Sequence, residues 1–264
     1  MDQRSQYIWE LLREEQEKLR KKLRKGVWSV QEQGKIEDEK ARQRLRQQAE
    51  TRNVEIRTKL GESIISFFDV LKQLGWPPHG EMNLGEAKAI VEAAEASGVA
   101  AVADAVDRHF VRKYNSKGIL RMLDSWRRKK ALGERIEILE QAIQVHNYGC
   151  YYVSVPIILA QIEGIIADNT KHFGQMSGTK LIEYLEKEFK DKEQYSIENS
   201  YLNFCKLVLY KRFGHQQPIS SKFSRHAIIH GGDIKYGTEA GSLKAILTFD
   251  TLQALLLGEM DQES

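Results

Sequence analysis

The chain has 264 residues, of which 41% are hydrophobic and 29% are charged, and its formal net charge is only +3. This balance excludes a chain that is strongly basic throughout, while the length suffices for one large domain or two small ones. Two cysteines are too few for a disulfide framework. The first residues are too charged for a signal peptide, and no stretch reaches the roughly 18 uninterrupted apolar residues of a membrane span. We therefore expect a cytoplasmic protein that does not enter a membrane.

Residues 1–78 are expected to form a charged helical arm. Apolar residues recur there at helical spacing, and Lys and Arg outnumber Asp and Glu by 16 to 11 within the first 60 residues. The densest basic run, "KLRKKLRK" (18–25), would attract a polyanion. The arm could bind a protein partner, form a dimerising coiled coil, guide RNA or simply present a solvated face. Its last part, up to Leu74, is amphipathic and is expected to join a core.

The stretch "GWPPHG" (75–80) predicts the end of the arm and a linker, because prolines and glycines interrupt helices. We expect a helical middle segment over 79–131 and a helical domain over 132–264. No run alternates convincingly with period two, so the predicted fold class is all-α. Besides a short helix near residue 225, helical patterns cover 83–96, 99–115, 119–130, 133–149, 151–167, 181–190, 200–213 and 242–259.

The stretch "PISSKFSRHAIIHGG" (218–232) has the punctuation of a short helix. Ser220 and Ser221 are N-cap candidates, and the final glycine pair marks a C-terminal stop. His226 and His230 are four residues apart, so they share one face of the helix. The two isoleucines between them are expected to face a core.

Arg225 with the two histidines suits phosphodiester chemistry. An arginine grips phosphate oxygens with a fork of donors, and a histidine moves a proton near neutral pH. Two other interpretations stay open. His230 is well placed to cap a helix C-terminus, where the helix dipole favours its charged form. A zinc site formed by His226 and His230 lacks an obvious third ligand, since Asp233 is the only carboxylate nearby.

Glu163 is a second unusual residue, because it lies within the otherwise apolar stretch "VPIILAQIEGIIA" (155–167). A carboxylate among apolar side chains is costly unless it is paired and hydrogen-bonded. Arg225 and His226 are the best candidate partners in the chain. The alternative is an exposed edge of a helix that is buried on its other side.

Together these stretches resemble the HEPN superfamily over about residues 133–260. The resemblance rests on "ILEQAIQVHNYGCYYVSVPIILAQIEGII" (138–166) and on "SRHAIIHG" followed by "YGTEAGSLKAILTFD" (224–250). It implies a small all-α helical bundle, a homodimer and a metal-independent endoribonuclease without a cofactor. Many such proteins act in toxin–antitoxin or phage-defence systems.

The resemblance also implies roles for single residues. Arg225 would hold the scissile phosphate, and Glu163 would anchor Arg225. His230 would be the general base or acid that helps the RNA 2′-hydroxyl attack. His226 matches a polar position that is often Asn in the family, so it either orients the phosphate or provides a second proton-transfer group.

Tyr236, Lys222 and Lys235 are candidate substrate contacts, since aromatic faces bind unpaired bases and cations attract phosphates. Around Tyr236 a structural interpretation competes, in which Gly237 makes a turn and Thr238 caps the next helix. The expected substrate is RNA, possibly tRNA. The alternatives are a non-catalytic HEPN module that binds RNA or protein, and a helical adaptor in which the arm is the functional part.

Overall fold

Residues 60–264 form one of two units into which the chain divides, and residues 1–59 form the other. The computed structural model describes residues 17–18, 20–22, 44, 46–48, 51–52, 61–194 and 196–258. Within these ranges the secondary structure is helical and no strand occurs, so the all-α class is confirmed. The described residues of the first unit are helical and exposed. Most of the predicted arm, including part of its basic run, lies outside the described residues.

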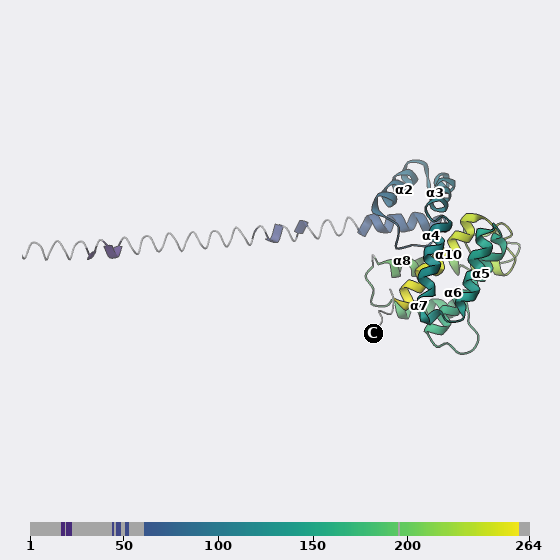
Figure 1. Ribbon diagram of the computed structural model, residues 1–264. Helices are drawn as coiled ribbons and strands as arrows, with labels where there is room; N and C mark the ends of the chain where they lie inside the picture. Colours follow the sequence, from purple (N-terminus) through teal and green to yellow (C-terminus); the bar gives the residue numbers. More distant parts are fainter. Residues whose placement is uncertain are drawn as a thin grey trace, which may run out of the picture. The chain divides into compact units, whose positions relative to one another are not determined.

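The second unit begins with a helical segment over residues 61–73 (Figure 1). The α-helices that follow are α2 (Leu84–Ser97), α3 (Val99–Lys113), α4 (Ser116–Arg127), α5 (Arg135–Asn147), α6 (Tyr151–Asn169), α7 (Gly178–Glu188), α8 (Ile197–Phe204), α9 (Arg225–Ile229) and α10 (Glu239–Leu257). A 3₁₀ turn, η1 (Lys130–Leu132), follows α4, and a π-helical turn, η2 (Cys205–Leu209), follows α8. The predicted helices are recovered, with most ends shifted by a few residues.

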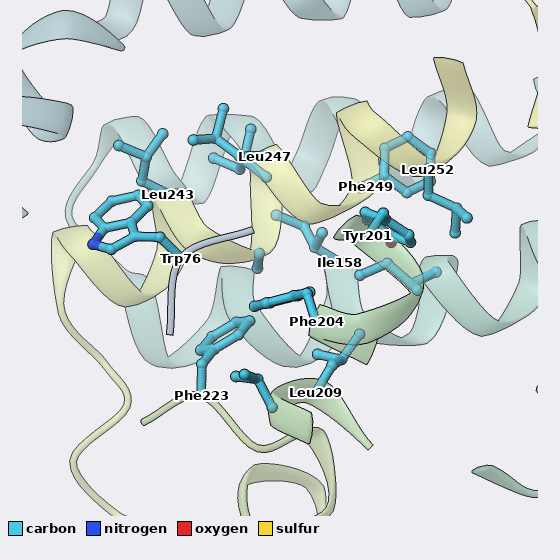
Figure 2. Close-up of a cluster of buried hydrophobic side chains, with 14 of the residues drawn as sticks. Trp76, Ile158, Tyr201, Phe204, Leu209, Phe223, Leu243, Leu247, Phe249 and Leu252 are labelled. Atoms are coloured by element: carbon cyan, nitrogen blue, oxygen red, sulfur yellow. The ribbon is translucent and has the colours of Figure 1, made fainter. Parts of the chain in front are cut away.

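Two apolar helices, α6 and α10, form the centre of the core and pack on each other (Figure 1). α10 is buried on nearly every side, and α5 covers another face of α6. Figure 2 shows Ile158 of α6 and Phe249 of α10 near Tyr201 of α8. Both central helices have the length and composition of a membrane span. Most of α10 is buried within the unit, whereas α6 is less than half buried and exposes Tyr152 and Val153.

The "GWPPHG" stretch is not the linker that its prolines and glycines predict. Trp76 has no exposed surface, and its indole Nε1 donates to Asp107 (2.8 Å). His79 is buried and contacts Asp250 of α10, 2.8 Å from Nε2 to Oδ2. Thr251 donates to the Pro78 carbonyl (2.9 Å). The stretch is therefore fixed to α3 and α10, because rigid prolines can pack as well as separate.

The core crosses both domain boundaries that were expected at residues 78 and 131. Phe67 and Leu71, which precede the first boundary, belong to the same buried cluster as Phe110, Leu139 and the central helices. The amphipathic end of the arm pattern thus joins the core, as predicted. The observed boundary lies near residue 60 instead, and the middle and C-terminal segments form one unit.

Candidate active site

Helix α9 carries Arg225 and His226, and both of its ends are tightly defined. The N-cap is Ser224, whose hydroxyl accepts from the Ala227 amide (3.2 Å), and not Ser220 or Ser221 as predicted. Ser221 instead donates to the Val208 carbonyl (2.8 Å), which attaches the preceding loop to η2.

The C-terminal end of α9 is the glycine stop that the sequence predicts. Gly231 has a φ of 73°, and its amide donates to Ile228, while the Gly232 amide donates to Ala227. These two bonds form a Schellman motif. His230 is the C-cap residue. Ile228 is buried as expected, but Ile229 is 38% exposed because the helix ends at that residue.

The predicted pairing of Glu163 with Arg225 is confirmed. Arg225 Nη2 donates to Glu163 Oε2 (2.8 Å), and Arg225 Nε lies 2.6 Å from Oε1. Both side chains are half-buried, at 18% and 22% exposure, so Glu163 does not lie at an open helix edge. Nη2 makes the hydrogen bond, whereas the close Nε contact is an ion-pair contact without hydrogen-bond geometry. Among the described residues, neither Nε nor Nη1 donates a hydrogen bond.

Burial raises the pKa of Glu163, and this effect outweighs the opposite effects of Arg225 and His230. Among the described residues, the carboxylate is thus paired with Arg225 alone, and its burial in α6 costs part of its hydration. A half-buried pair with an unused donor is suited to hold an anion such as a phosphate.

His226 and His230 present their rings on one face, as their spacing predicts. The rings are nearly parallel, with an interplanar angle of 8° and centroids 6.0 Å apart. His230 is exposed, whereas His226 is half-buried. Within the described part of the chain, none of their imidazole nitrogens has a hydrogen-bond partner. The exposed imidazole of His230 is therefore accessible to a ligand.

His226 is packed by two residues that the sequence analysis did not identify. The ring of Tyr210 meets it edge-on, with centroids 6.1 Å apart. A Cβ at Gly178 would lie 2.9 Å from its Nε2, so the absence of a side chain there admits the imidazole. Burial, together with the charges of Arg225 and His230, lowers the pKa of His226. Neither Gly178 nor Tyr210 has a local sequence signal, because both reach His226 through the packing of other helices.

The Tyr210 hydroxyl is a second feature that the sequence analysis missed. It is buried and has no hydrogen-bond partner among the described residues. Burial is the main reason why the pKa of Tyr210 is raised. The charges of Cys205 and Glu163 raise it further, whereas the charge of Arg225 opposes them. The hydroxyl therefore lies in the electrostatic environment of the ion pair.

A zinc site is not formed by the described residues, among which no group of three or more His, Cys, Asp or Glu could hold a metal ion. Asp233, the carboxylate considered as a third ligand, accepts from the Lys235 backbone amide (2.8 Å).

Tyr236 is fixed by a hydrogen bond to a carbonyl of α6 that Pro156 leaves without a helical donor. Pro156 lies inside α6 and has no amide hydrogen, so the Tyr152 carbonyl lacks its usual helical donor. The Tyr236 hydroxyl donates to that carbonyl (3.1 Å), and the Tyr152 hydroxyl donates to Ile234 (3.2 Å). Thr238 caps α10 by accepting from the Gly241 amide (2.9 Å), as the structural interpretation predicts. Tyr236 thus attaches the loop before α10 to α6, and its ring is half-buried.

The two predicted substrate lysines have different environments. Lys235 is exposed in the loop that joins α9 to α10. Lys222 is exposed but lies against Gly75, and its charge contributes to the lowered pKa of Lys244, after the larger effect of burial. The structure therefore places Lys222 beside the end of the helical segment 61–73.

Comparison with family models, with curated proteins and with solved structures finds no match for this chain. The geometry of α9 and α6 is thus the basis for any functional conclusion.

Proposed function

We propose that the chain is a metal-independent endoribonuclease of HEPN type, which acts as a homodimer in the cytoplasm. The proposal joins the sequence resemblance to the chemistry of the Arg225 site. A role in phage defence or in a toxin–antitoxin system follows from the resemblance alone. RNA, possibly tRNA, is the proposed substrate.

The observation that carries the proposal is the arrangement of Arg225 between a half-buried carboxylate, Glu163, and two histidines that have no hydrogen-bond partner among the described residues. Glu163 holds two nitrogens of the guanidinium, while Nη1 has no acceptor among the described residues. His230 lies exposed at the end of the same short helix, and its charge acts on Glu163. A phosphodiester bound to Nη1 would therefore lie near an imidazole that can exchange a proton with solvent.

The proposed reaction needs no oxidant and no water in its first step. The 2′-oxygen of the RNA forms a bond to phosphorus, and the bond from phosphorus to the 5′-oxygen breaks. One proton leaves the 2′-hydroxyl and one joins the 5′-oxygen, so the products are a 2′,3′-cyclic phosphate and a 5′-hydroxyl. Arg225 stabilises the charge on the phosphate oxygens.

His230 is the group that we propose for the proton transfers. In a two-fold homodimer, His230 of one copy accepts the 2′-hydroxyl proton and the same residue of the second copy supplies the proton to the leaving oxygen. His226 is enclosed by Gly178 and Tyr210, so it positions the phosphate instead of transferring a proton.

A non-catalytic module is the second candidate. It is favoured by the fact that Arg225 already has a two-point partner, as expected of an arginine that only stabilises the packing of α9 on α6. Such a module would bind RNA or protein without cleaving it, with the arm as a further contact for a protein partner.

The deciding experiment is cleavage of total RNA and of tRNA by the purified protein in EDTA. We expect cleavage by the wild type, and a loss of roughly 10²–10⁴-fold in His230→Ala. The products should carry a 2′,3′-cyclic phosphate. His109→Ala is a matched control, because His109 is an exposed histidine on α3 that is bonded to Glu86. Cleavage that survives in His230→Ala, or that requires a metal, would contradict the proposal.

A further inference from the structure

The segment Lys211–His215, "KRFGH", carries two adjacent exposed cations, Lys211 and Arg212. Residues 205–235 contain six Lys and Arg against one Asp, while the whole of residues 61–264 contains 24 against 26. The positive charge of the second unit is therefore concentrated around α9. Lys211 and Arg212 come directly after η2, at the point where the chain leaves the core.

Two contacts fix the segment along α9. At the start of the helix, the Ser224 hydroxyl donates to the Lys211 carbonyl (3.3 Å). At the other end, the Phe213 ring covers Gly232, where an added Cβ would lie only 1.8 Å from the ring. Lys211 is thus anchored beside Arg225, and Phe213 is anchored beside the residues that follow His230.

The two cations between these anchors are free to bind a ligand. Both Lys211 and Arg212 are exposed, and within the described ranges neither side chain has a hydrogen bond or an ion pair. Lys206, five residues before Lys211, shows the contrast, because its ammonium lies 2.6 Å from Glu186. A neighbouring carboxylate thus neutralises the cation in the core-facing turn but not those beside α9.

We propose that Lys211 and Arg212 form a phosphate-binding pair for single-stranded RNA. The pair binds phosphates next to the one at Arg225. This inference rests on the proposed function for the identity of the polyanion. Contacts to phosphates strengthen binding without reading the base sequence. The contacts of Ser224 with the Lys211 carbonyl and of Phe213 with Gly232 keep the segment beside α9.

Binding of a probe that cannot be cleaved separates this inference from catalysis. A fluorescein-labelled oligouridylate with methylated 2′-hydroxyls is titrated by fluorescence anisotropy at several salt concentrations. For Lys211→Ala/Arg212→Ala we expect binding about tenfold weaker and a salt slope reduced by about 1.4, since each lost contact to a single strand removes about 0.7. The matched control is Lys117→Ala/Arg121→Ala, which removes the same charges from exposed positions on α4.

A second variant tests the position of the Lys211/Arg212 pair without changing its charge. Gly232→Ala would displace the Phe213 ring, so we expect weaker binding with the circular dichroism spectrum retained. Gly80→Ala is its control, because an added Cβ there meets no atom within 4 Å.

The outcomes distinguish the two proposals. The proposed phosphate-binding role of Lys211 and Arg212 is overturned if the wild type does not bind the probe, or if the α4 control weakens binding as much as Lys211→Ala/Arg212→Ala does. If the wild type cleaves ordinary RNA but Lys211→Ala/Arg212→Ala binds the probe normally, the phosphate-binding role is wrong and the ribonuclease proposal stands. If Lys211→Ala/Arg212→Ala specifically loses binding but the wild type cleaves no RNA, the phosphate-binding role is supported and the ribonuclease proposal is wrong.

Discussion

Two clusters in the second unit combine histidine with a carboxylate, and they differ in the number of hydrogen bonds that each group makes. In the buried cluster, His79 uses both ring nitrogens, one on Asp250 (2.8 Å) and one on the Tyr114 hydroxyl (3.1 Å). Asp250 also accepts from Trp126 (2.6 Å). At α9, the nitrogens of His226 and His230 have no partner among the described residues.

The pKa values of the two carboxylates follow this difference. Burial alone would raise the pKa of Asp250, but hydrogen bonds from His79, Trp126 and Gln253 together lower it. Burial raises the pKa of Glu163, and among the described residues Arg225 alone donates a hydrogen bond that opposes this effect. The cluster at His79, in which each group is hydrogen-bonded, stabilises the fold. The cluster at α9 has donors and acceptors without partners among the described residues, and these can bind a ligand.

The sharpest test compares the substitution of one histidine from each cluster, His79 and His230. We expect His79→Ala to lower the free energy of unfolding by about 3 kcal/mol, because it removes a buried imidazole whose two nitrogens contact Asp250 and the Tyr114 hydroxyl. We expect His230→Ala to change that free energy by less than about 0.5 kcal/mol, since the residue is exposed, and to reduce cleavage by roughly 10²–10⁴-fold. Urea denaturation and cleavage per folded molecule are the two measurements. A His79 variant that folds normally, or a His230 variant that unfolds, would remove the distinction.

The anchor of Arg225 gives the next largest expected effect. Glu163→Gln keeps the size of the side chain but loses the charge that orients the guanidinium. We expect cleavage to fall roughly tenfold to a hundredfold, because a small displacement of a phosphate-binding group is costly. Asp168→Asn is the control, since it removes an α6 carboxylate that is paired with Arg135. Equal losses in both variants would indicate damage to α6 and not to the site.

A third histidine extends the comparison to pH. Burial lowers the pKa of His146 to about 4 from an ordinary value of 6.5, and its Nδ1 lies 2.8 Å from the Ser242 hydroxyl. Between these values the unfolded chain binds more protons at this position than the folded one. Its contribution to stability is therefore present above pH 6.5 and is lost as the pH falls toward 4, by about 1.4 kcal/mol per pH unit.

His146→Gln should flatten this dependence. The measurement is the difference in unfolding free energy between wild type and variant, from urea denaturation at several pH values. A difference that does not change with pH would mean that His146 titrates normally in the folded state.

The smallest effect is expected for His226→Asn. Because Gly178 and Tyr210 enclose His226, we assign it a positioning role that an amide can also fill. Cleavage should fall by less than about tenfold, and its pH profile should keep the shape of the wild type. A loss as large as that of His230→Ala would instead make His226 a proton-transfer group.

The candidate site was partly predictable, and one physical cost explains which part. A glutamate within an apolar helix requires a partner, and that requirement predicts the contact of Glu163 with Arg225 across 62 residues of sequence. The glycine stop after His230 follows from local backbone geometry. The packing of Gly178 and Tyr210 on His226 was not predictable, because apolar contacts between helices leave no such requirement at a single position. The role of Pro156 in freeing a carbonyl for Tyr236 belongs to the same class.

The sequence by itself determined the all-α class, most helices and the residues that carry charge at α9. These follow from periodicity and from local caps, which act within a few residues. Only the tertiary structure decided that most of "GWPPHG" is buried against α3 and α10, that Lys222 lies beside Gly75, and that the segment Lys211–His215 lies along α9. Each of these depends on contacts between distant segments, whose geometry is set by how the core closes and not by any local preference.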